Sequence, residues 1–523
     1  MLDRQLISAA IWISGAIIGP LALTSALEGD PIPALIVGTL IFIFFIIFVL
    51  KDRAIALPIL GMSIGGKLNF LPMGLDGVSV MSVGLIVYYF FTYFTMKQRN
   101  LQVGPYSIGI PLMVVGCIIG VHTLISYTHS NVEGFRPGLM ILLAIVTYFC
   151  GVSVSSPPRE FLARLPLYTF ILSMIFAIPN VLTTYFPDLA PYLYYFIDSV
   201  NVDAYKESKG MTTDIVRNGA LAGVGGGLEL FLLSYFPIYT WWHPHRWWVA
   251  ILSLIGIALI VSGGYRGGVV MFGYVMMLAL WALFSWRSLF VLPFVLMCAY
   301  ILSLGVTSGI IPLSVATQRS LSFLPGQWDQ TAVESASASV DFRTGIQTIY
   351  LKEDLLKSPW VGNGFAFNKQ DYEELMDLAR TSETADHYYE SKSFVAGKLF
   401  HIGWISMYDS VGVIGSLAFL TLFVTLFVLT GLPVWGKNNH NAQLFPLKVW
   451  LFCIMGSQLL GFFTVFGDLR TAVILLTSNA IIIVHLYRIE SVWKQKVVIP
   501  QIEEKANIRL TEVVDASTAY PQY

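Results

Sequence analysis

The sequence predicts an all-α polytopic membrane protein with about 14 transmembrane helices, within a range of 12–14. Hydrophobic residues make up 56% of the 523 residues and charged residues only 12%, whereas a soluble domain carries roughly 25% charged residues. The mean hydropathy is +0.69. A chain this long with so little charge has too few polar groups to cover its surface in water. Soluble multidomain, fibrous and disordered classes are therefore excluded.

The individual spans follow from apolar stretches of about 20 residues, the length that crosses a bilayer as a helix. The stretch 54–73 is the weakest of them, because Lys67 and several glycines interrupt it. The fourteen predicted spans are 6–27, 32–50, 54–73, 77–96, 106–127, 137–156, 162–182, 218–240, 246–263, 267–285, 288–306, 403–432, 446–466 and 470–487.

The distribution of Lys and Arg over the short loops predicts the orientation, because cytoplasmic loops carry the excess of both. Alternate connections carry Arg4, Lys51 and Arg53, Lys97 and Arg99, Arg159 and Arg164, Arg246, Arg287, Lys437 and Lys448, and then Arg488, Lys494 and Lys496. The opposite connections are nearly bare of basic residues. An even number of spans with both termini in the cytoplasm follows.

These spans divide the chain into five parts. They are 1–182 with N-terminal transmembrane helices, 183–306 with central transmembrane helices and a first external loop, 307–402 as a large extracytoplasmic loop between the eleventh and twelfth spans, 403–487 with C-terminal transmembrane helices, and 488–523 as a cytoplasmic tail. Within the large loop, 345–357 and 371–380 have the pattern of short amphipathic helices. A loop of this length in a compact protein indicates a function.

Four arginines stand out because they fall on the side of the membrane that is poor in basic residues. Arg217 precedes a span, Arg266 lies in the turn SGGYRGG, Arg343 lies in the large loop and Arg470 follows Asp468. Guanidinium groups bind phosphate oxygens bidentately, so converging arginines would suit a lipid-linked diphosphate. Taken singly, each arginine could instead reach lipid phosphates or pair with a carboxylate, as Asp468 could neutralise Arg470.

His401 closes the large loop at the outer end of the twelfth span. A neutral imidazole there could take a proton from a hydroxyl group, or it could cap the entry to the helix. The net charge of −1 gives no reason to expect nucleic-acid binding. The four cysteines lie in apolar stretches without a CxxC pair or a neighbouring histidine, so we expect no metal site.

The segment that begins at His401 resembles the signature of the O-antigen ligase and polymerase superfamily. That signature starts with a His, which is usually followed by an Asn. Nine further residues then lead to a glycine-rich apolar run of the GLLG type. Here His401 and Ile402 are followed by the nine residues Gly403 to Val411 and then by Gly412-Val413-Ile414-Gly415. The family's Pro-containing glycine turn is similar to SPWVGNGFAFN, with Pro359, Gly362 and Gly364.

Upstream motifs of the family also have counterparts in family order. Arg343 occupies the place of an arginine ahead of the glycine turn, Tyr265-Arg266-Gly267 resembles a Ser-Arg-Gly turn, and Arg217-Asn218-Gly219 resembles an Arg-x-Gly entry to a span. The resemblance covers about residues 212–430. Ile402 and Tyr265 depart from the polar residues usual at those positions, and fourteen spans exceed the dozen or so typical of the ligases.

The resemblance implies a metal-independent, inverting membrane glycosyltransferase without a cofactor, located in the bacterial cytoplasmic (inner) membrane. Its donor would be a polyprenyl-diphosphate-linked oligosaccharide at the outer face of that membrane. Arg217, Arg266 and Arg343 would bind the diphosphate, with Arg266 and His401 as catalytic residues and Arg470, Gly362 and Gly364 as further candidates. A flippase and a chain-length regulator are the protein partners that such an enzyme would have.

The acceptor stays open between another lipid-linked glycan, which makes a surface-polysaccharide or exopolysaccharide polymerase, and a lipid or protein, which makes a ligase. We favour the polymerase slightly because the chain matches only sparse motifs. A transporter or flippase for the lipid-linked glycan is the alternative of another class. The absence of two related halves in the sequence and the long external loop both count against it.

Overall fold

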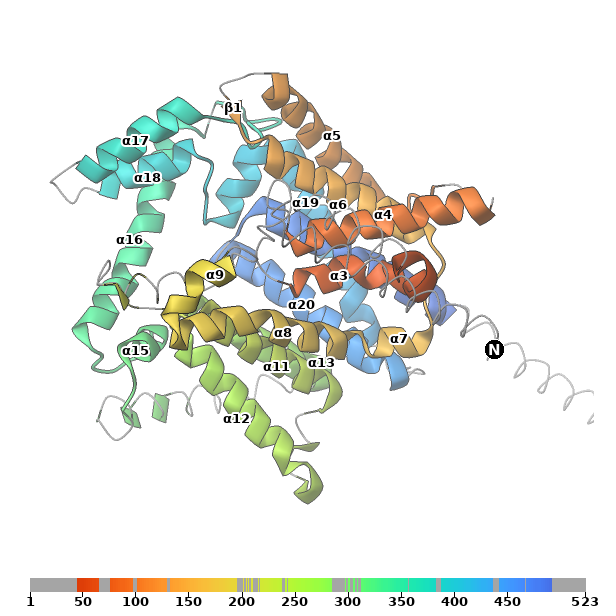
Figure 1. Cartoon of the computed structure of the whole chain (residues 1–523), viewed down its shortest axis with the longest axis horizontal. Helices are drawn as coiled ribbons and strands as arrows, with labels where there is room; N and C mark the ends of the chain where they lie inside the picture. The colour runs from red at the N-terminus through yellow and green to blue at the C-terminus, as the bar shows by residue number, and fades with distance from the viewer. Residues whose placement is uncertain are drawn as a thin grey trace, which may run out of the picture.

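The computed structural model describes residues 45–64, 76–96, 101–128, 132–194, 217–237, 240–284, 312–381, 387–435 and 442–491, apart from single positions within them, and isolated residues between 201 and 215 and between 297 and 308. Across this part of the chain nearly all regular structure is helical (Figure 1). The exception is one antiparallel pair of two-residue strands, β1 (Val132–Glu133) and β2 (Phe367–Asn368).

Nine helices in the described residues are long and apolar enough to cross a membrane. They are Gly77–Thr95 within α4 (Gly77–Met96), α5 (Tyr106–Thr128), α6 (Phe135–Ser153), α8 (Leu165–Tyr185), Pro244–Ser262, which contains α12 (Trp247–Ser262), α13 (Arg266–Phe284), Gly403–Val434 within α19 (Gly403–Trp435), α20 (Phe445–Thr464) and the helix Leu469–Ser491. The prediction of an all-α, multi-pass membrane protein is confirmed. Each of these helices coincides with one predicted span.

The other five predicted spans match the described helices only in part or lie outside the described residues. The span 218–240 corresponds to α11 (Gly219–Tyr235), an apolar helix of 17 residues. The described start of 54–73 is a 3₁₀ turn followed by the short α3 (Leu57–Met62). The spans 6–27, 32–50 and 288–306 lie wholly or largely outside the described residues. The count of fourteen therefore stays a prediction.

Close approach of small residues holds several of these helices together. A Cβ atom at Gly225 of α11 would lie 2.5 Å from the carbonyl oxygen of Gly256 on α12, so only glycine fits there. A Cβ atom at Gly403 would lie 2.1 Å from the carbonyl oxygen of Phe462, where α19 starts beside the end of α20. Lipid offers no hydrophobic drive for helix association, and backbone contact of this kind replaces it.

The large loop is folded onto one end of the helical bundle. It contains α15 (Val315–Leu321), α16 (Gln330–Glu353), β2, α17 (Lys369–Thr381) and α18 (His387–Ala396), which gather on the left in Figure 1. A small core that includes Ile346, Tyr350 and Phe400 joins α16 and α18 to the start of α19. The pairing of β2 with β1 ties the loop to the connection between α5 and α6.

The two amphipathic helices predicted in this loop differ in how well they match. The segment 371–380 lies within α17, as predicted. The segment 345–357 is the end of a longer helix, because α16 starts at Gln330 and stops at Glu353. Its first turns read AVESASAS, which is too polar and too poor in large apolar residues for an amphipathic pattern to reveal a helix.

Candidate functional site

Arg266 lies at the end of the bundle that the loop covers. It is the first residue of α13 and follows a tight turn in which Gly264 has a φ of 78°, a conformation that favours glycine. Its guanidinium donates a hydrogen bond to the carbonyl oxygen of Ala336 on α16. The turn between α12 and α13 therefore directs Arg266 toward α16.

Arg319 is a second arginine of this site, and it is absent from the residues predicted from sequence. It lies on α15 with an exposed fraction of 3%. Its guanidinium donates to the carbonyl oxygen of Gly264 at 2.7 Å, to Ser335 Oγ at 2.9 Å and to Ser339 Oγ at 3.1 Å. No motif surrounds Arg319, and it lies in a polar loop where charged residues are common. Its burial against α16 is visible only in the folded chain.

Arg343 and Arg217 complete the group. Arg343, two turns after Ala336 on α16, donates to the carbonyl oxygen of Val465 at 2.8 Å. The side chain of Arg217 lies beside Gly264, since a Cβ atom at this glycine would be 3.5 Å from Arg217 Cγ. The charges of Arg217 and Arg343 both act on Arg266, and all three act on Arg319. We call Arg217, Arg266, Arg319 and Arg343 the arginine cluster.

The positive charges of the arginine cluster favour the binding of an anion. Burial, followed by the charges of Arg217 and Arg266, lowers the pKa of Arg319 to about 10. Burial also lowers the pKa of Arg343. Among the described residues, none of the four arginines forms an ion pair with a carboxylate. The guanidinium groups of Arg266, Arg319 and Arg343 donate to neutral oxygens, which orient these groups and leave the repulsion between them in place.

His401 lies next to the arginine cluster. Burial, and then the positive charge of Arg343, lowers its pKa, while the carboxylate of Asp468 acts in the opposite direction. The imidazole ring is 5.8 Å from the ring of Phe394 on α18, measured between centroids. A lowered pKa keeps this imidazole neutral at pH 7, which is the form that accepts a proton. The structure thus brings His401 and Arg343 close enough for the charge of Arg343 to act on the imidazole.

Arg470 differs from the arginine cluster in having a carboxylate partner. Its Nε is 3.6 Å from Asp468 Oδ2. Asp468 also caps the helix Leu469–Ser491, because the same oxygen accepts hydrogen bonds from the backbone N–H and the hydroxyl of Thr471. This arrangement favours a structural role for Arg470, as the ion-pair partner of Asp468, over a role in binding phosphate.

Gly362 and Gly364 have a structural role beside α19. The helix is interrupted at Gly412, where φ is 61° and ψ is −166°. The segment 359–364 fills this break: Asn363 and Gly364 donate backbone hydrogen bonds to Asp409 and Ser410, and Val413 and Ile414 donate to Pro359 and Trp360. The two glycine motifs, separated by about 50 residues in the sequence, are therefore in direct contact.

A buried ion pair reinforces this junction. Lys398 Nζ is 2.8 Å from Asp409 Oδ2, and Asn363 Nδ2 donates to Asp409 Oδ1 at 2.9 Å. The side chain of Asp409 is fully buried. The end of the large loop is thereby held on α19, eight residues after His401. Gly362 and Gly364 contribute to the site by fixing this junction.

The fold and the site together define a multi-pass helical membrane protein with an arginine cluster and a histidine at one end of its helices, under a folded loop. The sequence matches no model of a known protein family, and no curated protein matches it. The functional assignment therefore depends on the chemistry of the site.

Proposed function

We propose that this protein is a membrane glycosyltransferase that uses polyprenyl-diphosphate-linked glycans and polymerises the repeat units of a surface polysaccharide or exopolysaccharide. The observation that carries the proposal is the arginine cluster beside His401. Four arginines from four separate segments lie close together, and among the described residues none of them forms an ion pair with a carboxylate. A diphosphate has the charge and the oxygen geometry to bind such a group.

The residues support a direct displacement. A hydroxyl oxygen of the acceptor attacks the anomeric carbon of the donor, and the bond from this carbon to the diphosphate oxygen breaks. The electron pair of that bond leaves on the polyprenyl diphosphate, whose growing negative charge the arginines stabilise. The hydroxyl proton passes to the neutral imidazole of His401. Attack from the face opposite the leaving group inverts the anomeric centre.

The membrane context of the proposal follows from the charge distribution. The arginine cluster and the large loop would face the outside of a bacterial cytoplasmic membrane, and both termini would lie in the cytoplasm. A lipid-linked donor then reaches the site from the outer leaflet after a flippase has delivered it. A chain-length regulator is a further expected partner.

Two alternative functions would use the same arginine cluster. In a ligase, the same chemistry transfers the glycan to a lipid or protein acceptor. In a transporter or flippase, the arginine cluster binds the diphosphate without breaking a bond, and His401 has no chemical role. The position of His401 beside Arg343 and the folded loop over the site favour the enzyme.

Replacement of His401 distinguishes catalysis from transport. We expect His401→Ala to lower the rate of glycan transfer about 10²–10⁴-fold, the usual contribution of a general base, while binding of the lipid-linked donor persists. The measurement is the chain-length distribution of the glycan in a strain that lacks the native gene, with protein level checked by immunoblot. Normal glycan chains with His401→Ala would exclude the catalytic role.

The pH dependence of the transfer rate is a second test of His401 as the general base. A base acts in its neutral form, so the rate falls when pH drops below the pKa of His401, which lies under the ordinary histidine value of about 6.5. Asp468→Asn keeps a helix-capping side chain but removes the charge that raises this pKa. The acid limb of the rate profile should therefore move to lower pH. An unchanged limb would contradict His401 as the titrating base.

The orientation can be measured separately. A cysteine introduced at position 380, in a variant without the native cysteines, should react with a membrane-impermeant thiol reagent in intact cells. A cysteine at position 53, in the short connection expected to be cytoplasmic, is the matched control and should react only after permeabilisation. The reverse pattern would overturn the proposed topology.

A further inference from the structure

Glu229 is an acidic residue buried between helices of the bundle, with an exposed fraction of 0%. It lies on α11, which starts at Gly219. At 1.5 Å per residue the two residues are about 15 Å apart along the helix, roughly half of the ~30 Å thickness of the hydrocarbon core. An ionisable residue at this depth of a membrane is costly and usually has a function. No step of the proposed glycosyl transfer uses Glu229.

The contacts of Glu229 satisfy only part of its carboxyl group. Oε2 accepts a hydrogen bond from Ser253 Oγ on α12 at 3.0 Å. Oε1 is buried and has no hydrogen-bond partner within the described part of the chain. An ionised carboxylate in this place would lose its hydration for one hydrogen bond, whereas a neutral carboxyl group loses much less on burial. These contacts favour the protonated form of Glu229.

The helices around Glu229 offer it no ion-pair partner among the described residues. α11 packs against α8, α12, α13 and α20. Arg266 donates to Ala336 at the arginine-cluster end of α13, Lys448 of α20 pairs with Glu490, and α12 has no titratable residue. The titratable residues of these helices are Tyr168 and Tyr185 on α8, Arg266 and Tyr274 on α13, and Lys448 and Cys453 on α20.

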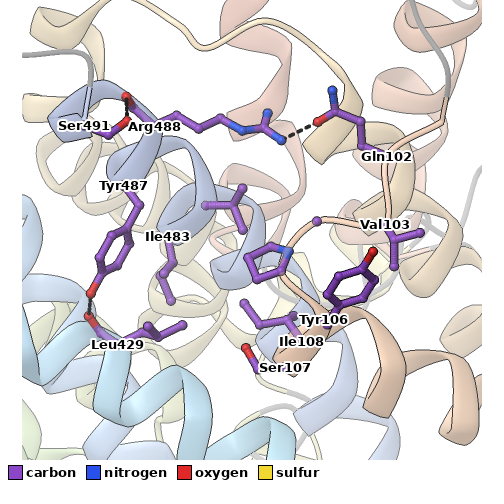
Figure 2. Close-up of a pocket in the computed structure, with 13 residues that line it drawn as sticks. Gln102, Val103, Tyr106, Ser107, Ile108, Leu429, Ile483, Tyr487, Arg488 and Ser491 are labelled. Atoms are coloured by element: carbon purple, nitrogen blue, oxygen red, sulfur yellow. Dashed lines mark hydrogen bonds between the residues drawn. The ribbon is translucent and has the colours of Figure 1, made fainter. Parts of the chain in front are cut away.

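The contact between α11 and α12 has room for a proton at Glu229 but not for a metal ion. A Cβ atom at Gly256 of α12 would lie 2.7 Å from Glu229 Oε1. A metal ion needs several oxygen ligands around it, and the space beside Oε1 does not admit one methyl carbon. Neither Glu229 nor Ser253 lines the groove of about 730 Å³ near the end of the helix Leu469–Ser491 (Figure 2).

We propose that Glu229 is a proton-binding site inside the membrane, and that its bound proton keeps α11 joined to α12. Oε1 carries the proton as a hydroxyl group, and Oε2 is the carbonyl oxygen that accepts the hydrogen bond from Ser253. Loss of the proton leaves a negative charge in a contact between two helices that excludes water. The two helices would then have to separate before this charge could be hydrated.

α11 and α12 also carry residues of the arginine cluster. Arg217 precedes α11, where the backbone N–H of Asn218 donates to the carbonyl oxygen of Gly263 at 3.0 Å. Gly263 ends α12, and the turn that follows leads to Arg266. Separation of the two helices would therefore move Arg217 relative to Arg266. This consequence bears on the proposed function, but the proton-binding site itself does not rest on it.

Infrared difference spectroscopy of the purified full-length protein tests the proton directly. The C=O stretch of a protonated carboxyl group is separate from the bands of ionised carboxylates, and exposed carboxylates are ionised at pH 7. The wild-type spectrum should contain a protonated-carboxyl band that Glu229→Gln removes. Glu334→Gln is the matched control, since Glu334 is exposed on α16, and it should leave the band in place.

Two results of this experiment would overturn the site. The first is a spectrum in which Glu229→Gln removes no protonated-carboxyl band. The second is a band that appears only after Na⁺ is removed from the buffer, which would show that the carboxylate binds a metal cation.

Ser253→Ala probes the one hydrogen bond to the carboxyl group. The band of Glu229 should remain and move to higher frequency, because its C=O group no longer accepts a hydrogen bond. Ser262→Ala is the control, as Ser262 is exposed on the same helix and its Oγ donates to the carbonyl oxygen of Leu259. A band that Ser253→Ala leaves unmoved would contradict the assigned contact.

The stability of the protein should depend on the same proton. In the unfolded chain a Glu carboxyl ionises above about pH 4.3, whereas the folded protein keeps Glu229 protonated. Rising pH therefore favours the unfolded chain until the folded carboxyl also ionises. The Tm of the wild type should fall relative to that of Glu229→Gln between about pH 5 and about pH 8; a constant difference would contradict the proposal. These measurements need no glycan, so their outcome is independent of the proposed glycosyltransferase activity.

Discussion

Arg266→Ala should reduce glycan transfer to the background of the assay. The guanidinium of Arg266 is oriented by Ala336 on α16 and lies among three other arginines. If it stabilises the departing diphosphate, its loss removes an interaction that grows stronger as the bond breaks. Removal of one such donor typically lowers kcat by about 10²–10³-fold. The readout is polymer formation from a purified lipid-linked oligosaccharide in proteoliposomes.

The replacement Arg266→Lys refines this test. It keeps the charge but not the bidentate fork, so an intermediate rate is expected. Arg246→Ala is the matched control: Arg246 precedes α12 at its other end, and its guanidinium lies 5.9 Å from the centroid of the Phe236 ring. Full activity of Arg266→Ala at a normal protein level would rule out the arginine cluster as the catalytic centre.

Gly412→Ala should be the most damaging of the small substitutions for stability. With φ at 61° and ψ at −166°, Gly412 adopts a backbone conformation that is essentially restricted to glycine. A Cβ atom there would lie 2.4 Å from the carbonyl carbon of Trp360 and 2.5 Å from the backbone nitrogen of Gly362. Because both are backbone atoms, the segment 359–364 would have to leave the break in α19.

We expect this substitution to lower the free energy of unfolding by at least about 3 kcal/mol, combining backbone strain with loss of the inter-segment hydrogen bonds. The measurement is thermal unfolding of the purified protein, followed by the fraction that stays monodisperse on size exclusion. Leu417→Ala, on the same helix and 61% exposed, is the control and should change stability little. A Tm for Gly412→Ala equal to that of Leu417→Ala would contradict the role assigned to the break.

Much of the architecture could be predicted because membrane insertion depends on local properties of the chain. Nine apolar stretches became long helices, since lipid requires each segment to satisfy its own backbone hydrogen bonds. The same reasoning identified Arg217, Arg266 and Arg343, because a basic residue on the side poor in basic residues is unusual wherever it lies. His401 was identified first from its position at the end of the large loop and then from the resemblance to a family signature, and the structure places it beside Arg343.

Other features depend on contacts between distant segments, which no local pattern encodes. Arg319 lies in a polar loop, and only the packing of α15 against α16 gives it its hydrogen bonds to Ser335 and Ser339. The length of α16 was underestimated because its small polar residues carry no amphipathic signal; Ser335 and Ser339 on its first turns face Arg319. The sequence already offered Asp468 as a partner for Arg470, and the structure places Arg470 Nε 3.6 Å from Asp468 Oδ2.

The sequence by itself determined that this protein is helical and that several of its apolar segments are long enough to cross a membrane. These properties follow from hydropathy and charge along the chain, and they hold whatever the helices pack against. Only the tertiary structure decided which arginines meet and that the two glycine motifs join at the break in α19. The reason is physical: convergence and burial are properties of pairs of segments, and a single segment does not contain its partner.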